Sequence, residues 1–132
     1  MANLVKYQVL VKGTKLACET LPMLLPAAGD SLDILREEGT DTDYSMLFSN
    51  VCNWSVASGS ASTRRRKPFT QEELKAIEYN CYYTLKDLSR LLDCEIFCAE
   101  VDIDDPRCWG RYHYCRGKAT RVEFPQEVIP QV

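Results

Sequence analysis

Cysteine and histidine side chains gather between residues 94 and 115, where they could together bind zinc. The members of this group are Cys94, Cys98, Cys108, His113 and Cys115. Structural zinc sites use these side chains, typically with two residues between paired cysteines. Cys94 and Cys98 lie on one predicted strand, where their spacing places them about 13 Å apart at ~3.3 Å per residue. One tetrahedral ion does not span that distance, so we expect no metal or cofactor and keep a zinc-supported domain as an alternative.

The single histidine, His113, is also the candidate general base for a nucleophilic cysteine. Cys108 lies beside it in a predicted loop, and a Cys–His pair can form covalent intermediates. The strand pattern turns His113 toward an apolar face, however, where histidines usually serve as hydrogen-bonded packing. No sequence signature marks a reactive thiol, and the acidic residues at 100–105 lack the spacing of a calcium loop. The sequence therefore predicts no enzymatic activity.

Basic residues and tyrosines occur in a combination that could bind nucleic acid. Residues 64–67 are four consecutive bases, and a predicted helix carries Lys86 and Arg90 together with Tyr79 and Tyr83. In such proteins aromatic rings stack on bases while Lys and Arg side chains follow the phosphates. The net charge of −3 argues against a surface built throughout for nucleic acid. A nucleic-acid-binding module is therefore an alternative to our main hypothesis.

The main hypothesis is binding to another protein through tyrosine and arginine side chains, which dominate interface hot spots. On a helix over 70–92, Tyr79 and Tyr83 lie one turn apart, opposite the apolar stripe, where only a second layer of the chain or a partner would cover them. The acidic segment 30–43 could give electrostatic complementarity either to a basic partner or to residues 64–67 of a neighbouring copy. The candidate binding residues are Tyr79, Tyr83, Lys86, Arg90, Arg64, Arg65, Arg66, Tyr112, Tyr114 and Arg121. We expect a small non-enzymatic inhibitor, adaptor or assembly subunit that self-associates.

The length of the chain indicates a single domain over residues 1–132. The chain is 45% hydrophobic and 27% charged, which is ordinary for a globular protein, and no apolar run is long enough for a membrane span. Its seven cysteines are an odd number, which excludes complete pairing within one chain. We expect reduced thiols and a cytoplasmic protein, since residues 1–6 lack the order of a secretion signal.

The element with the strongest pattern is a helix over 70–92. Thr70 and Glu73 form a capping box at its start. Apolar residues then recur at helical spacing along one face. They are Leu74, Ile77, Cys81, Leu85, Leu88 and Leu92. The preceding segment 57–68 is rich in Ser, Gly and Arg, so we expect a flexible loop there.

Strands and a second helix are predicted in the N-terminal half. Residues 4–12 alternate as a half-buried strand, and Gly13-Thr14 is a plausible turn into a second strand over 15–20, giving an N-terminal hairpin. Asp30 or Ser31 can cap a short helix that ends at Gly39. Residues 44–56 are expected to be extended.

The C-terminal part predicts a strand over 94–103 and a hairpin. The hairpin joins residues 111–116 to 119–124 through Gly117-Lys118, pairing Tyr112 with Glu123 and Tyr114 with Arg121 on a solvent-exposed face. Residues 125–132 are expected to be extended and suited to docking. The fold class is therefore α+β, with a mostly antiparallel sheet packed on one long helix.

Overall fold

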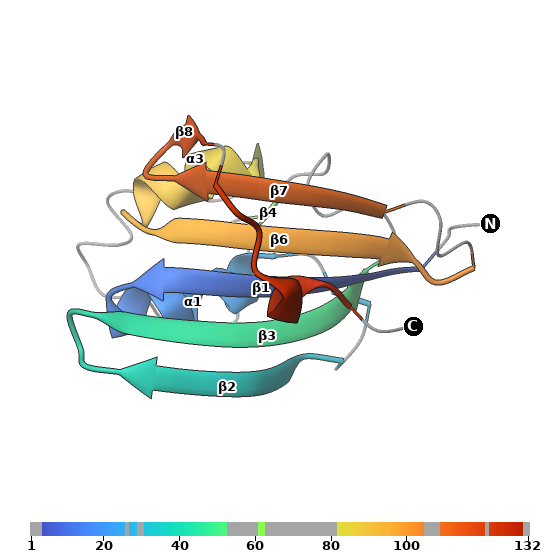
Figure 1. Cartoon of the computed structure of the whole chain (residues 1–132), viewed down its shortest axis with the longest axis horizontal. Coiled ribbons are helices and arrows are strands. Elements are labelled where there is room, and N and C mark those ends of the chain that lie inside the picture. The colour runs from blue at the N-terminus through green and yellow to red at the C-terminus, as the bar shows by residue number, and fades with distance from the viewer. Residues whose placement is uncertain are drawn as a thin grey trace.

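The structure is a computed structural model, and it describes residues 4–25, 27–28, 31–52, 61–62, 82–104, 109–120 and 122–130, with the backbone alone for 61–62, 82–83 and 109. The described residues form an antiparallel six-stranded sheet in the order β2-β3-β1-β6-β7-β8 (Figure 1). Its strands are β1 (Val5–Gly13), β2 (Asp33–Gly39), β3 (Tyr44–Cys52), β6 (Glu95–Asp102), β7 (Trp109–Cys115) and β8 (Lys118–Ala119). The α+β class predicted from the sequence is confirmed.

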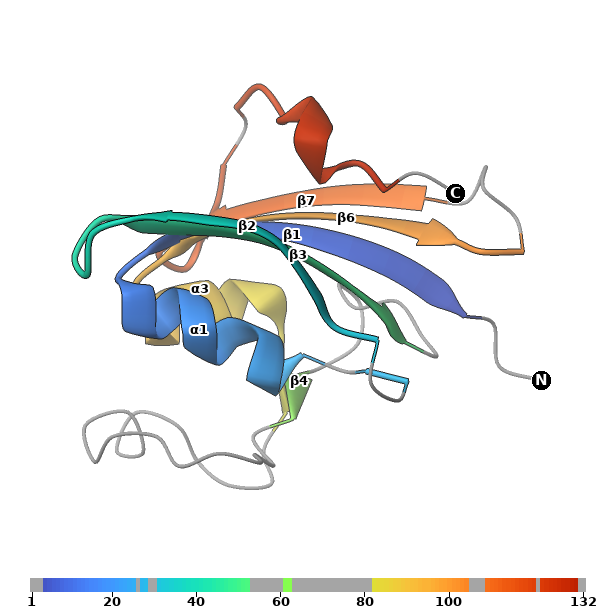
Figure 2. The same ribbon diagram turned by 90° about the horizontal axis from the view of Figure 1, so that it is seen from below.

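The remaining described elements lie around this sheet. They are the helices α1 (Lys15–Leu24) and α3 (Leu85–Leu91), the 3-10 turn η1 (Gln126–Val128), and a short antiparallel pair of β4 (Ala61–Ser62) and β5 (Tyr82–Tyr83). Figure 2 shows α1 and α3 on one face of the sheet and η1 on the other. No helix in the described part of the chain is long and apolar enough to cross a bilayer.

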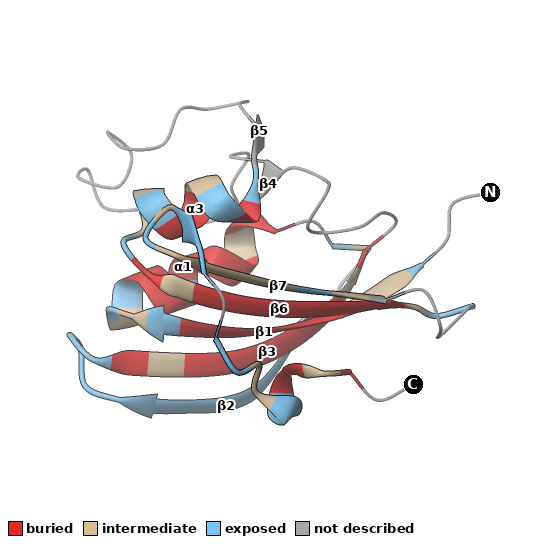
Figure 3. Cartoon of the chain, turned by 45° about the horizontal axis from the view of Figure 1, so that its top comes forward, coloured by how far each residue is buried: buried red, intermediate tan, exposed pale blue. Residues whose placement is uncertain are grey.

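Two hydrophobic cores form on the two faces of β1, which lies between β3 and β6. On the helix side Val9 and Val11 are fully buried against Leu21 of α1 and Leu88 of α3. On the opposite side a smaller core contains Leu10, Leu47, Phe97, Ala99 and Val128. The strand predicted to be half-buried is thus covered on both faces (Figure 3). Each such side chain contributes about 1.5–3 kcal/mol by leaving water.

The N-terminal hairpin is wrong, because residues 15–24 form α1 and not a second strand. Thr14 caps this helix, and its side-chain oxygen accepts a hydrogen bond from the backbone N–H of Ala17 at 3.1 Å. Cys18 and Leu21 then face the core at helical spacing. Both edges of β1 pair with β3 and β6, so no edge remains for a strand over 15–20.

The short helix ending at Gly39 is also wrong, since residues 33–39 form β2 on the free edge of β3. The pairing shifts register between Ile34 and Arg36, and this bulge interrupts the two-residue alternation of a strand. Leu32 and Leu35, three residues apart, therefore imitate helical spacing. Gly39 does end the element: its φ is +118°, and a Cβ there would overlap the carbonyl oxygen of Asp43.

One continuous helix over 70–92 is wrong as well. Residues 82–83 form β5, Thr84 caps α3, and α3 ends at Leu91. Thr84 and Asp87 make a second capping box, in which the Asp87 N–H donates to the Thr84 hydroxyl at 3.2 Å and the Thr84 N–H donates to the Asp87 carboxylate at 3.1 Å. The apolar stripe is confirmed at Leu85 and Leu88, which are buried. Residues 70–81 lie outside the described part.

Most of the other predicted elements are confirmed in part. β6 confirms the strand over 94–103, and β3 confirms the extended segment as far as Cys52, with 53–56 outside the described residues. The segment 57–68 also lies largely outside them, apart from 61–62 in β4.

The C-terminal hairpin turns one residue earlier than predicted. Arg116 and Gly117 form the turn with φ of 49° and 87°, which is the positive-φ pattern of a type I′ turn. Tyr114 therefore pairs with Ala119, not with Arg121, and β8 has two residues only. The extended docking tail is wrong at residues 126–128, which form η1 and bury Val128 against the sheet of the same chain.

Candidate interface at the exposed sheet edge

The described strand with the most exposed surface is β2. All seven of its residues are exposed, and no other described strand pairs with its outer side (Figure 3). The outer side of an edge strand presents unpaired backbone N–H and C=O groups, which form a template for another extended chain. Leu32, Ile34 and Leu35 add large apolar side chains to this edge, and each is more than one-third exposed.

An open groove of about 380 Å³ lies beside the edge, between α1 and β2. Its lining residues are Glu19, Pro22, Met23, Leu32, Ile34, Glu37 and Met46. The walls are mainly apolar, and two of them are methionines, whose unbranched side chains adapt to differently shaped ligands. The groove can therefore accept an apolar side chain from an added strand.

A tyrosine of β3 holds one of the two groove carboxylates in place. The Tyr44 hydroxyl donates a hydrogen bond to Glu37 Oε1 at 2.7 Å. This hydrogen bond is the main reason that the pKa of Tyr44 rises to about 12, and burial adds to the increase. Glu37 is therefore ordered on the groove side of β2, opposite Met46.

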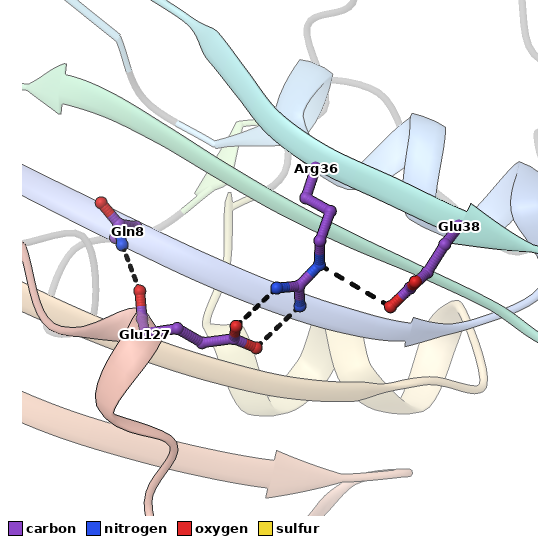
Figure 4. A network of polar contacts seen from close by, with 4 residues as sticks. All are labelled: Gln8, Arg36, Glu38 and Glu127. Atoms are coloured by element: carbon purple, nitrogen blue, oxygen red, sulfur yellow. Dashed lines mark hydrogen bonds and ion pairs between the residues drawn. The ribbon is translucent and has the colours of Figure 1, made fainter.

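The charge of the edge depends on a contact with the C-terminal segment (Figure 4). Arg36 binds the Glu127 carboxylate through two hydrogen bonds of 2.5 and 2.7 Å, and Glu38 lies 3.7 Å away. The hydrogen bonds between the two side chains raise the pKa of Arg36 and lower the pKa of Glu127, and their opposite charges add to both shifts. Arg36 is the one base in β2, so its neutralisation leaves the edge with Asp33, Glu37 and Glu38.

The C-terminal segment is held by more than this ion pair. The amide of Gln8 in β1 donates to the backbone carbonyl of Glu127 at 2.5 Å. Val128 is fully buried, and Phe124 and Ile129 pack against the same small core. Arg36 is thus held over the face of the sheet that carries η1, away from the groove on the helix face.

One of the two tyrosines predicted to share a helix face, Tyr83, lies on a strand. Tyr83 belongs to β5, so it does not continue a helix that contains Tyr79, and Tyr79 itself lies outside the described residues. Arg64, Arg65, Arg66 and Arg121 are also outside them. The binding role of these residues stays a prediction, but the shared helical face that suggested it for Tyr79 and Tyr83 is absent.

Tyr112 and Tyr114 do not lie on a solvent-exposed face. Both are half-buried and pack against the main core on the helix side of the sheet. The Tyr112 hydroxyl donates to Glu100 Oε1 at 3.1 Å, and Glu100 is itself buried. Their rings therefore stabilise the fold more than they offer a contact surface.

The turn between β7 and β8 brings Lys86 and Arg90 close to two further bases. Both residues are exposed on α3. The turn packs on this helix, because the Gly117 N–H donates to the Ser89 hydroxyl at 2.9 Å. Arg116 and Lys118 flank that glycine, although neither was a candidate from the sequence, and Arg116 also pairs with Asp93 at 3.0 Å.

His113 has the packing role expected of it. Its ring stacks on Phe97 with centroids 4.1 Å apart, its side chain is 6% exposed, and its Nε2 hydrogen-bonds to Glu95 at 2.7 Å. Cys94 and Cys98 are buried, and burial raises the pKa of both thiols. The described residues contain no group of three or more His, Cys, Asp or Glu side chains placed to hold a metal. Cys108 lies outside them.

Comparisons of the chain with protein-family models, with curated proteins and with solved structures find no match in any of the three.

Proposed function

We propose that this chain is a small non-enzymatic protein-binding protein that captures an extended segment of another protein along β2. The observation that supports this proposal is an exposed edge strand with an open apolar groove directly beside it. In strand addition, backbone hydrogen bonds to the edge supply affinity, and pockets for alternate side chains supply specificity. β2 and the groove combine both requirements.

The proposed complex is weak and reversible. One added strand and one groove make a contact smaller than the roughly 800 Å² per partner of a standard interface. Such a contact fits an adaptor or inhibitor that exchanges partners.

The five described cysteines are free thiols, and four of them are buried, which supports a reducing compartment such as the cytoplasm.

The proposal is tested with Leu32→Ser, which removes an apolar wall of the groove. The probe is a displayed library of random ten-residue peptides, with binding followed by the backbone NMR shifts of residues 33–39. The matched control is Leu16→Ser on α1, because Leu16 and Leu32 are both 45% exposed and only Leu32 lines the groove. We expect the wild type and Leu16→Ser to select peptides and Leu32→Ser to lose them. Selected peptides that shift residues elsewhere and leave β2 unchanged would contradict the proposal.

Nucleic-acid binding is the second candidate, and the bases gathered around α3 favour it. Lys86, Arg90, Arg116 and Lys118 lie around the contact between α3 and the β7–β8 turn. Binding of a single-stranded oligonucleotide would weaken steeply with salt, because each neutralised phosphate releases a counterion. The variant Lys86→Ala with Arg90→Ala would then lower both affinity and salt dependence. Binding that is unaffected by the two substitutions would rule out this surface.

A further inference from the structure

We infer that the segment captured by β2 is basic: an extended peptide that places one apolar side chain in the groove and Lys or Arg side chains on either side of it. This inference rests on the proposed function and names its class of partner. It follows from the order of side chains along β2, from the charges that line the groove, and from the contact that occupies Arg36.

Side chains on the groove side of β2 change from apolar to acidic along the strand. Ile34 and Glu37 are the groove-lining residues of β2, and they pair with Phe48 and Met46, whose side chains belong to the main core. Residues two apart on an added strand lie on one face, separated by about 6.6 Å. If the added strand places an apolar residue beside Ile34, the residue two positions further along that strand lies near Glu37. Glu19 of α1 lines the same groove and adds a second carboxylate.

The other side of β2 is acidic at both ends. Asp33 and Glu38 pair with Ser49 and Ser45, on the face of the sheet that carries the C-terminal segment. Arg36 lies between them in sequence and is held by Glu127 at 2.5 Å. An added strand therefore meets carboxylates on both of its faces, while the one base of β2 is neutralised by the same chain. Opposite charges across neighbouring strands are favourable, and like charges are not.

The same charges disfavour a second copy of β2 as the occupant. Antiparallel pairing of two copies would bring Asp33, Glu37 and Glu38 of each chain to one shared edge, with both arginines held by Glu127. We therefore do not expect the self-association predicted from the sequence to use β2. A basic segment satisfies the backbone groups, the groove and the carboxylates together.

The test uses three labelled nine-residue peptides of one alternating pattern with a central isoleucine, whose flanking positions are all lysine, all glutamine or all glutamate. Fluorescence anisotropy with the intact chain gives their affinities. We expect the lysine peptide to bind at least about fivefold more tightly than the glutamine peptide, and the glutamate peptide not to bind. The preference should shrink between low and high salt as the charges are screened.

Two variants locate the effect. Glu37→Gln should lower the affinity for the lysine peptide and leave the affinity for the glutamine peptide unchanged. Glu123→Gln is the control, because Glu123 is exposed and lies outside β2 and the groove. Equal binding of the lysine and glutamine peptides, with both lost in Leu32→Ser, would overturn the basic partner and leave strand capture standing. A dimer that Leu32→Ser abolishes, with no binding of any peptide, would overturn both in favour of a second copy.

Discussion

At the scale of single residues, burial decides the chemistry of the cysteines. Burial is the largest cause of the raised pKa of Cys18, to about 11, and of Cys94, to about 12. Cys98 is shifted in the same direction, whereas Cys115 is half-buried on β7. The odd number of cysteines showed that they cannot all pair within one chain. The sequence could not rank them, because the ranking depends on which faces of β6 and β7 are covered.

This ranking predicts selective alkylation. Because burial shields Cys18, Cys94 and Cys98 from the reagent and raises their pKa, these three should react with iodoacetamide at pH 8 at least about tenfold more slowly than the more exposed Cys115. Peptide mass spectrometry of the native protein over a time course measures the rates, and the same protein in denaturant gives the reference. Comparable rates at all four thiols in the native protein would show that the core around α1 and β6 is open.

The acidic residues of the candidate site show how much of the site could be predicted from the sequence at the level of single residues. From their excess over 30–43 the sequence predicted a complement that is either a basic partner or residues 64–67 of a neighbouring copy. The sequence did not show that Asp33, Glu37 and Glu38 stand on a sheet edge. The sequence also did not indicate that Arg36 forms an ion pair with Glu127. These two residues lie far apart in the chain, and only the packing of the C-terminal segment on the sheet brings them together.

At the scale of elements, local pattern correctly predicted β6 and the extended residues of β3, and it failed for residues 15–24, 33–39 and 82–83. Residues 15–20 were predicted as a strand, but both edges of β1 pair elsewhere and residues 15–24 form α1. Residues 33–39 were predicted as part of a short helix, because the bulge at Leu35 hides the strand alternation. The pairing of neighbouring strands thus decided these elements, and a single segment does not contain that information.

The capping box of α3 gives a prediction for this scale. Thr84→Ala removes the acceptor of the Asp87 N–H and the hydroxyl that bonds the Asp87 carboxylate, and should lower the free energy of unfolding by about 1–2 kcal/mol. Thr14→Ala on α1 loses one cap bond to Ala17 and should cost about 1 kcal/mol or less. Urea denaturation of both variants measures the difference. A larger loss for Thr14→Ala would show that α3 contributes less to the main core than its buried Leu85 and Leu88 indicate.

At the scale of the whole molecule, the C-terminal segment joins several strands across one face of the sheet. It covers the small core through Val128 and neutralises Arg36 through Glu127. The sequence predicted a tail suited to docking, and the docking site is the chain itself. That contact was not predictable, because it joins residues from β1, β2, β3 and β6 that meet only in the completed sheet.

Acidification should remove one of the contacts that hold this segment, the ion pair between Glu127 and Arg36. The pKa of Glu127 is lowered in the folded chain, so its contribution is present at neutral pH and is lost as the pH falls below the ordinary carboxyl pKa of ~4.3 and through the lowered value. The methyl signals of Val128, followed by NMR from pH 7 to pH 3, should shift over that range. In Arg36→Gln the Glu127 carboxyl titrates at its ordinary pKa, so the shift should begin at higher pH. Identical titration in both proteins would show that the ion pair does not hold the tail.

The central position of β1 has a consequence for biosynthesis. Its two partner strands, β3 and β6, are translated later, and β6 much later. Until residues 95–102 have been synthesised, one edge of β1 has no partner strand. Its apolar side chains Val9, Leu10 and Val11 are then only partly buried. Closing such distant pairs is slow. A nascent chain stalled before β6 is therefore a substrate for chaperones, and early termination there should yield aggregates where the full-length product stays dispersed.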